Sequence, residues 1–280
     1  MRFPGNASAL LVDIGGTTIA AGPVTSETPR DIIPTPTNAA AALEVLEHLA
    51  RHSDSEDVVI IAAPGLVDPN GSVGLALFSP LREIDLASAV AAWAPSGVVV
   101  MNDAKLQALN YLDSRGPHLH LTIGTAVGGA IVVNGALLDG ARGYAGEIGH
   151  IRVPSALEQS CPCGQQGCLD TLASGWSLVR DLGDHWWDRE SPECDDRIAL
   201  AGLAVAEGLG AASMLLDLDS YSIAGRITEW DAFLGAIDAE ETSARFERLP
   251  AEHDSWAAAR AGALRLVAEG FQLNRLPGHA

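Results

Sequence analysis

One histidine and three cysteines lie within nineteen residues of the chain: His150, Cys161, Cys163 and Cys168. Zn²⁺ binds four such ligands tetrahedrally, and Cys₃His is a standard set for a closed structural site. Glycines between the last two cysteines favour a tight knuckle, because glycine tolerates φ > 0. A disulfide or unpaired thiols are the alternatives. Cys161 and Cys163 are separated by one residue, which disfavours a mutual disulfide, so the spacing favours a metal.

A glycine turn near the N-terminus is a candidate phosphate site. Apolar runs at 9–14 and 19–24 flank it and predict a β-hairpin. Two glycines let backbone N–H groups approach a phosphate, threonine hydroxyls add donors, and an aspartate could hold Mg²⁺. Taken alone, a Gly-Gly turn is more often a simple turn. The candidate phosphate and magnesium ligands are Asp13, Gly15, Gly16, Thr17 and Thr18.

Two β-branched runs, 58–62 and 98–101, predict strands that are buried on both faces of a sheet. Asn102 and Asp103 directly follow the second run, at the end of a strand where open α/β sheets place their chemistry. The same pair is also typical of a helix cap, and by the residues alone the cap is favoured. Gly65, which follows the first run, is by itself more typical of a plain turn.

A second strand, glycine turn and strand unit follows in the middle of the chain. Residues 118–123 and 131–133 are apolar, and Gly124 to Ala130 between them are small. Two such hairpins, about one in each half, predict duplicated α/β domains that face each other across a cleft.

The segments 147–150 and 161–168 read Glu-Ile-Gly-His and Cys-Pro-Cys-Gly-Gln-Gln-Gly-Cys. They resemble the Glu-x-Gly-His and Cys-x-Cys-Gly-x-x-Gly-Cys pair of the ROK family of sugar kinases, repressors and open reading frames. The resemblance implies an α/β fold of two actin-like (ribonuclease H-like) lobes around an inter-domain cleft, with a zinc knuckle at 150–168. The expected lobes are 1–113, completed by a C-terminal helix at 255–280, and 114–254.

The resemblance also implies roles for single residues. Asp103 would be the general base, and His150 would bind zinc through one imidazole nitrogen and sugar through the other. The implied sugar-binding residues are Gly65, Asn102, Asp103, Glu147, His150 and Asp170. The implied nucleotide-binding residues are Asp13, Gly15, Gly16, Thr17, Thr18, Gly124, Thr125, Gly128 and Gly225.

The chain departs from the family pattern at several of these places. Thr18 stands where a lysine is frequent, Asp170 replaces a glutamate, and Ala126 and Ala130 replace two glycines of the second phosphate motif. An alanine where the backbone needs φ > 0, or where it must press against phosphate, would cost stability or affinity and so alter nucleotide binding. Of the three glycines that relatives carry in the turn against adenosine, this chain keeps one, Gly225. The next residue, Arg226, could stack on adenine or block the adenosine pocket.

The remaining chain predicts helices at 39–50, capped by Thr37 or Asn38, and at 178–187, 198–218 and 255–270. The last of these is expected to bury a face made by Ala258, Ala261, Leu264 and Val267. Cys194 lies in a polar stretch and is expected to be a surface thiol. Trp186 and Trp187 are expected to be packing residues.

The composition excludes several functions. The formal net charge is −19, from 36 acidic and 17 basic residues, which excludes a nucleic-acid partner because phosphate contacts need clustered Lys and Arg. The N-terminus lacks a leader pattern, and we expect no membrane-spanning segment. A reducing cytoplasm is the expected location.

The resemblance, together with these patterns, implies an ATP- and magnesium-dependent hexose kinase with a structural zinc. By the family's pattern, our first hypothesis is a glucokinase that acts on the 6-OH of glucose. Two alternatives stay open: a non-catalytic sugar-binding regulatory protein, and a kinase for N-acetylmannosamine or another hexose. The resemblance implies a homodimer or homotetramer, with sugar and ATP as small-molecule partners.

Overall fold

The computed structural model describes residues 8–52, 58–94, 96–188, 191–240 and 246–269. The first seven residues, where no leader is expected, and the tail 270–280 lie outside the described residues. The chain divides into two compact units, and each has its own hydrophobic core. Unit 1 is Met1–Asn110, Asp139–Ala145 and Ser255–Ala280, and unit 2 is Tyr111–Leu138 and Gly146–Asp254. Residues 111–113 belong to unit 2 and residues 139–145 belong to unit 1, whereas the predicted lobe boundaries placed each segment in the other half.

Unit 1 contains a five-stranded sheet in the order β3-β2-β1-β4-β7. Its elements are β1 (Ala9–Ile14), β2 (Thr18–Pro23), β3 (Asp31–Pro34), α1 (Ala39–Arg51), β4 (Val58–Ala63), β5 (Ser72–Val73), β6 (Ile84–Asp85), α2 (Leu86–Ala91), β7 (Val98–Asn102), α3 (Asp103–Ala108) and α8 (Ser255–Glu269). The predicted N-terminal hairpin is β1 and β2, which pair antiparallel, whereas β1, β4 and β7 are parallel neighbours.

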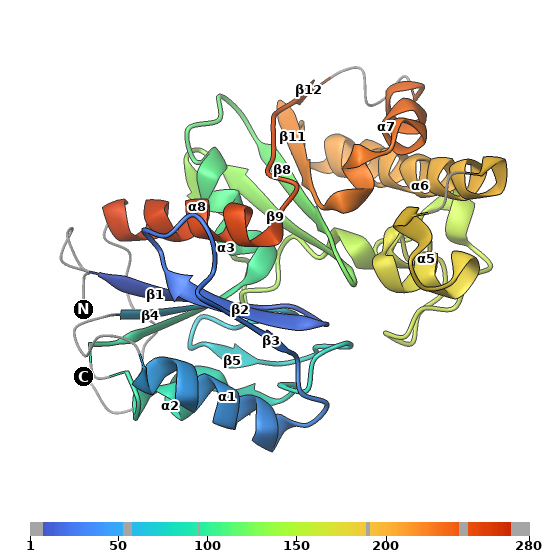
Figure 1. Cartoon of the computed structure of the whole chain (residues 1–280). Helices are drawn as coiled ribbons and strands as arrows, with labels where there is room; N and C mark the ends of the chain where they lie inside the picture. The colour runs from blue at the N-terminus through green and yellow to red at the C-terminus, as the bar shows by residue number, and fades with distance from the viewer. Residues whose placement is uncertain (1–7, 53–57, 95, 189–190, 241–245, 270–280) are drawn as a thin grey trace. The chain divides into compact units, whose positions relative to one another are not determined.

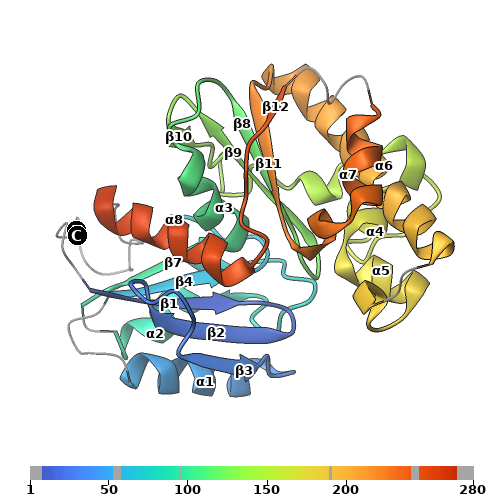
Figure 2. The ribbon, with the colours of Figure 1, turned by 45° about the horizontal axis from the view of Figure 1, so that its top comes forward.

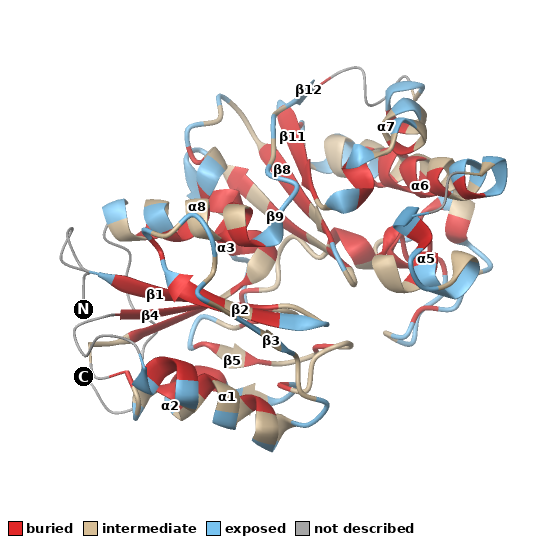
Figure 3. Ribbon diagram, viewed as in Figure 1, coloured by how far each residue is buried: buried red, intermediate tan, exposed pale blue. Residues whose placement is uncertain are grey.

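The apolar runs explain this sheet. All six residues of β1 and of β4 are buried (Figure 3), as expected for strands covered on both faces. Helices α1 and α2 lie on one face, and α3 and α8 lie on the other (Figure 1). Helix α1 begins at its predicted cap, since the Asn38 side chain accepts from the backbone N–H of Ala41.

Unit 2 repeats the arrangement. Its sheet runs β10-β9-β8-β11-β12, again three antiparallel strands followed by two parallel ones. Its elements are β8 (His118–Ile123), β9 (Val127–Val133), β10 (Ala136–Leu137), α4 (Asp170–Ala173), α5 (Gly175–Leu182), α6 (Pro192–Leu216), β11 (Ser220–Ala224), α7 (Asp231–Asp238) and β12 (Glu247–Arg248). Helices α6 and α7 lie side by side along this sheet (Figure 2). The predicted duplication of an α/β unit is therefore present.

The prediction for Cys194 was wrong. Helix α6 begins at Pro192, six residues before the predicted start, because Ser191 caps it by accepting from the backbone N–H of Cys194. This brings Cys194 onto the same helix face as Ile198 and Ala201, and its residue is 1% exposed. Helix α5 likewise ends at Leu182, five residues before the predicted end, where Gly183 has φ of +83°.

The buried face of α8 also differs from the prediction. Leu264 is 36% exposed, whereas Ala259, Ala263 and Leu266 are fully buried. In so alanine-rich a helix the sequence gives little contrast between faces. The crossing with α3 decides the orientation, because a Cβ on Gly262 would collide with the carbonyl of Leu106.

One helix of the described residues, α6, is long and apolar enough to cross a membrane by length and composition. Its buried residues include Ile198, Val205 and Leu209, which belong to the core of unit 2. This is the pattern of a core helix in a folded domain.

Candidate active site and zinc knuckle

In unit 1 the predicted site residues gather at the carboxyl ends of three parallel strands. Asp13 of β1 lies opposite Ala62 of β4, and Ala63 of β4 lies opposite Asn102 of β7. The residues that follow these strands must therefore be neighbours, as expected at this edge of an open α/β sheet.

Asn102 connects two of these strand ends. Its side-chain amide donates to the carbonyl of Gly65 across 3.0 Å, and its side-chain oxygen accepts from the backbone N–H of Lys105 across 3.1 Å. The helix-cap interpretation of Asn102 is thus confirmed. Gly65 has φ of +91°, and a Cβ there would lie 2.5 Å from the carbonyl oxygen of Leu75. The position needs glycine, because the backbone turns back closely on itself.

Asp103 is the first residue of α3 and is half-buried. Burial raises the pKa of its carboxyl group to about 6, although the N–H of Ala104 and the side chain of Asn102 oppose the rise. A carboxylate with that pKa is suited to accept a proton near neutral pH. Two residues on, the buried Lys105 donates to Asp139 across 2.9 Å and fixes the loop 139–145 to α3.

The first glycine turn is held by its own backbone and by β3. Gly15 donates to the carbonyl of Thr18 across 2.8 Å, and Thr35 donates its hydroxyl to the carbonyl of Gly15 across 2.8 Å. Thr17 and Thr18 are exposed, and Asp13 is 8% exposed at the end of β1. Neither Gly15 nor Gly16 has positive φ. Glycine is favoured at position 15 because there is little room for a side chain, since a Cβ on Gly15 would lie 3.0 Å from the carbonyl oxygen of Thr18.

In unit 2 the second glycine turn is shorter than predicted. Strand β9 begins at Val127, four residues before the predicted start, because residues 127–130 pair with β8. Gly124 is exposed, and Thr125 and Gly128 are half-buried. Neither Ala126 nor Ala130 has positive φ, so the expected conformational cost of these two alanines does not arise.

Gly225 lies beside this turn. It directly follows β11, the parallel neighbour of β8, and a Cβ on it would collide with the carbonyl of Ile123. Its φ of +123° also requires glycine. The exposed Arg226 stacks on the ring of Trp187 at 5.2 Å from the centroid, and Trp187 is 37% exposed. Trp186 is buried, and Trp187 packs against His185 and Trp186 as well as this arginine, in agreement with the predicted packing role of both.

The Glu147–His150 segment packs directly on β9. It forms a short 3₁₀ helix over Ile148–His150, with Glu147 as its N-cap. A Cβ on Gly149 would collide with the carbonyl of Val127. Glycine in the Glu-x-Gly-His motif therefore lets Glu147 and His150, both half-buried, approach the strand that starts at the second glycine turn.

The four predicted metal ligands come together. The ligand atoms of His150, Cys161, Cys163 and Cys168 all lie within 4.8 Å of one another. Cys163 and Cys168 sulfurs are 3.7 Å apart, and Cys161 Sγ lies 3.8 Å from His150 Nδ1. A tetrahedral ion with Zn–S bonds of about 2.3 Å would place its sulfurs about 3.8 Å apart. All three cysteines are free thiols, which rules out the disulfide alternative.

The protonation state of these thiols depends on whether a cation is bound. Burial raises the pKa of Cys161 to about 11 and raises that of Cys168 further. Without a cation these sulfurs would be neutral thiols packed around an uncharged centre. Zn²⁺ would supply the positive charge that stabilises three adjacent thiolates.

Asp170 differs from the implied sugar ligand. It is fully buried, at 0% exposure. One carboxylate oxygen accepts from the backbone N–H of Val127 and the other from the indole N–H of Trp176, each across 2.7 Å. Burial raises its pKa, and these two hydrogen bonds lower it. The structure thus uses both oxygens inside unit 2.

Sequence reasoning missed the roles of Val127, Trp176 and Lys105. The hydrogen bond from Val127 to Asp170 joins residues that are 43 positions apart, so no local sequence pattern could have predicted it. Lys105 could have been noticed as a charged residue in the first turns of a helix that must be buried.

Comparison with known proteins gives a family. The model of the ROK family matches residues 9–265. A glucokinase from Halalkalibacterium halodurans is 35% identical over 190 residues, which cover 60% of this chain and 57% of that protein. The match thus spans little more than half the length of this relative. An N-acetylmannosamine kinase from Yersinia pseudotuberculosis is 30% identical over 275 residues, covering 87% of this chain and 91% of the relative.

Among solved structures, a ROK glucokinase from Streptomyces griseus in complex with glucose and AMPPNP is similar, with a TM-score of 0.76 and 25% identity. The similarity covers 92% of this chain and 99% of that one. The predicted α/β class with two actin-like lobes is therefore confirmed.

Proposed function

The chain belongs to the ROK family, and we propose that it is an ATP-dependent hexose kinase. It transfers the γ-phosphoryl group of ATP to a sugar hydroxyl. The observation that carries the proposal is the packing of the Glu147–His150 segment on β9, the strand that begins at the second glycine turn. The proposed sugar-binding pair and the proposed phosphate-binding turn therefore both lie against one strand of unit 2.

In this proposal the sugar is held by Glu147, His150, Asn102 and the backbone at Gly65. His150 uses Nδ1 for the zinc, the nitrogen nearest Cys161, which leaves Nε2 for a sugar hydroxyl. The zinc orients this ring and fixes its tautomer. Asp103 is the general base.

The sugar oxygen attacks the γ-phosphorus, the bond from that phosphorus to the ADP oxygen breaks, and the hydroxyl proton passes to the Asp103 carboxylate. The products are a sugar phosphate, ADP and a proton. Catalysis of this kind depends on positioning and on neutralising phosphate charge. Mg²⁺ bound with ATP supplies that neutralisation, and Asp13 is the residue proposed to hold it. The proposed phosphate-binding residues are Gly15, Gly16, Thr17, Thr18, Gly124, Thr125 and Gly128, and Gly225 is proposed to lie against adenosine.

The proposed acceptor is the 6-OH of glucose, as the glucokinase relatives suggest. N-acetylmannosamine is the second candidate, because the kinase for that sugar matches 87% of this chain, against 60% for the glucokinase. ADP release is measured with glucose, mannose, N-acetylmannosamine and N-acetylglucosamine at equal concentrations. Preference for glucose supports the first candidate, and preference for the acetamido sugars supports the second. No turnover with any sugar, while sugar still binds, would favour the non-catalytic alternative.

Ala126 and Ala130 do not have positive φ, which speaks against the conformational half of the motive for that alternative. A cytoplasmic location and a homodimer or homotetramer complete the proposal. Light scattering coupled to size exclusion tests the oligomeric state.

A further inference from the structure

We propose that Asp170 is a positioning residue that connects the zinc knuckle to the phosphate turn 124–127, and that it is not a direct sugar ligand. The inference rests on the proposed function for the identity of the phosphate group, which would be part of ATP. The hydrogen bonds that hold the turn lie within unit 2 and do not depend on the proposed function.

The carboxylate of Asp170 faces inward. Its two oxygens accept from Val127 N and Trp176 Nε1, and the residue has no exposed surface. A sugar hydroxyl would have to displace one of these donors. Loss of either bond would leave a buried polar group without its partner, which is costly.

Backbone bonds reinforce the same connection. Gly175 donates to the carbonyl of Gly124 across 2.8 Å, and Trp176 donates to the carbonyl of Thr125 across 3.1 Å. With the bond from Val127 to Asp170, three of the four residues in the turn are held by the segment 170–176. The turn would keep its shape before any phosphate arrives.

The other end of this segment begins at a zinc ligand. Cys168 precedes Asp170 by two residues, and its carbonyl accepts from the hydroxyl of Thr171 across 2.7 Å. Leu169 donates to the carbonyl of Ile151 across 3.0 Å, next to His150. Zinc binding at the knuckle therefore fixes the start of the segment that holds the turn.

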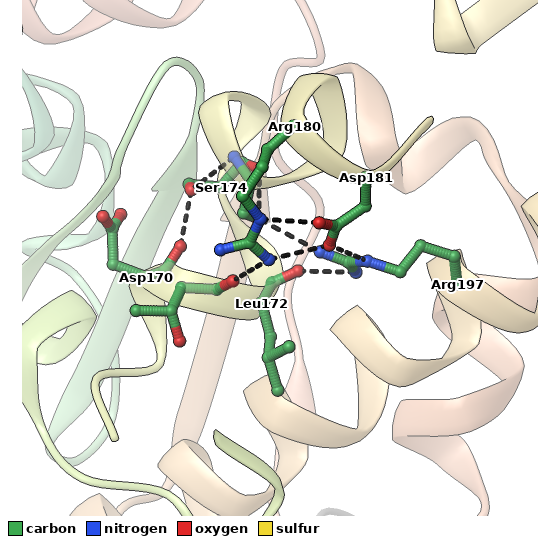
Figure 4. A network of polar contacts seen from close by, with 8 residues as sticks. Asp170, Leu172, Ser174, Arg180, Asp181 and Arg197 are labelled. Carbon is green, nitrogen blue, oxygen red and sulfur yellow. Dashed lines mark hydrogen bonds and ion pairs between the residues drawn. The ribbon is translucent and has the colours of Figure 1, made fainter. Parts of the chain in front are cut away.

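The segment is itself braced by α5 and α6 (Figure 4). The short helix α4 leaves its last carbonyls without partners inside the helix. Ser174 Oγ donates to Asp170 O across 2.5 Å, Arg180 to Thr171 O across 3.2 Å and Arg197 to Leu172 O across 2.8 Å. Asp181 lies between the two arginines and accepts from both. Arg180 also covers the ring of Trp176 at 5.2 Å. Such a network makes the position of Asp170 rigid.

Two variants test the role. Trp176→Phe removes one hydrogen-bond donor and keeps the ring, and Asp170→Asn removes the charge at constant size. Asp238→Asn is the control for the charge, since Asp238 accepts from Arg248 in the same unit but lies outside this network, and Trp93→Phe in unit 1 is the control for the indole. Each protein is assayed for zinc content, for amide hydrogen exchange in a peptide spanning 124–127, and for the dissociation constants of glucose, N-acetylmannosamine and AMPPNP.

We expect faster exchange at 124–127 and about tenfold weaker AMPPNP binding in both variants. Zinc should stay bound, and the sugar dissociation constants should change by less than about twofold. The controls should behave as wild type. If Asp170→Asn fails to fold, Trp176→Phe alone decides.

Unchanged exchange at 124–127 in Trp176→Phe, or a larger loss of sugar binding than of AMPPNP binding, would overturn the positioning role. Wild-type turnover is measured in parallel. Absence of sugar phosphorylation, with the exchange and AMPPNP results as expected, would reject the kinase proposal and leave the positioning role standing.

Discussion

The Nδ1 atom of His150 lies 3.8 Å from the sulfur of Cys161, on the side of the imidazole ring that faces the cysteine cluster. The ring therefore has one nitrogen committed to the cysteine cluster and one available for a ligand. A metal that binds Nδ1 keeps the proton on Nε2, so that this nitrogen is always a hydrogen-bond donor. Zinc in this account acts on sugar recognition through the histidine.

Replacement of Cys163 by serine should remove zinc and weaken sugar binding together. Serine is a poor zinc ligand, and the loss of one ligand from a set of four releases the ion and the orientation of His150. Metal analysis and calorimetry with sugar measure the two effects. Cys194→Ser is the control, because Cys194 is also buried but lies outside the cluster. A zinc-free Cys163→Ser protein with wild-type sugar affinity would refute the role of the metal.

Gly149→Ala should destabilise the protein by about 1–3 kcal/mol, a usual cost of overpacking. The added methyl group would collide with the carbonyl of Val127 and push the Glu147–His150 segment away from β9. Denaturant unfolding measures the change. Gly235→Ala is the matched control, since nothing lies within 4 Å of its Cβ and helix α7 favours alanine. Equal stability of the two variants would contradict the close packing described here.

Activity should rise with pH around pH 6. The pKa of Asp103 is about 6 in the folded protein, and only the ionised carboxylate can accept the sugar proton. The acid limb of kcat/KM against pH should therefore have its midpoint near 6. An acid limb with its midpoint near 4, the ordinary pKa of aspartate, would mean that burial does not raise the pKa of Asp103.

Asp103→Asn should stabilise the fold at pH 8 and leave it unchanged near pH 3. The folded pKa is raised, so the contribution of Asp103 to stability is fully present below the ordinary value of 3.8 and is lost as pH rises through 6. At pH 8 the ionised group costs on the order of 2 kcal/mol, which asparagine avoids. Unfolding curves at both pH values check this, and equal stability at pH 8 would contradict it.

Acid should destabilise unit 2 through two histidines inside its sheet. His118 and His120 are buried, bond to Ser220 and Ser222 and stack against Tyr111. Burial lowers the pKa of His118 to about 4 and that of His120 to about 3.

The unfolded chain takes up these two protons near pH 6.5, so stability falls as pH drops from 6.5 towards 4, by about 1.4 kcal/mol per pH unit for each histidine. A variant with both histidines replaced by glutamine should show a flatter pH dependence. Because release of the proposed zinc would also contribute in acid, the comparison is between variant and wild type. Parallel curves would contradict the prediction.

Much of the fold could be predicted because the strands carry their own signals. The β-branched runs of β4 and β7 and the two glycine hairpins need no distant information, and the cap at Asn38 is local. The cysteine cluster was equally predictable, since its ligands lie close together in the sequence.

The features that the sequence did not predict depend mostly on contacts that are distant in sequence. Strand β9 includes the small residues 127–130 because they form hydrogen-bonded pairs with β8. Helix α8 presents Gly262 to α3 because glycine allows the two helices to cross closely. The inward orientation of Asp170 depends on Val127, which precedes it by 43 residues. For α6, the Ser191 cap followed by Pro192 was a local start signal that the polar character of the stretch concealed.

The central claim, that Asp103 is the base of a sugar kinase, is tested most directly with Asp103→Asn. ADP release is measured with the sugar that the wild type prefers, and sugar binding is measured by calorimetry in the same preparation. The account predicts a loss of kcat of at least about a hundredfold, with a sugar dissociation constant within about threefold of wild type. Turnover close to wild type, or loss of sugar binding together with turnover, would contradict the assigned role.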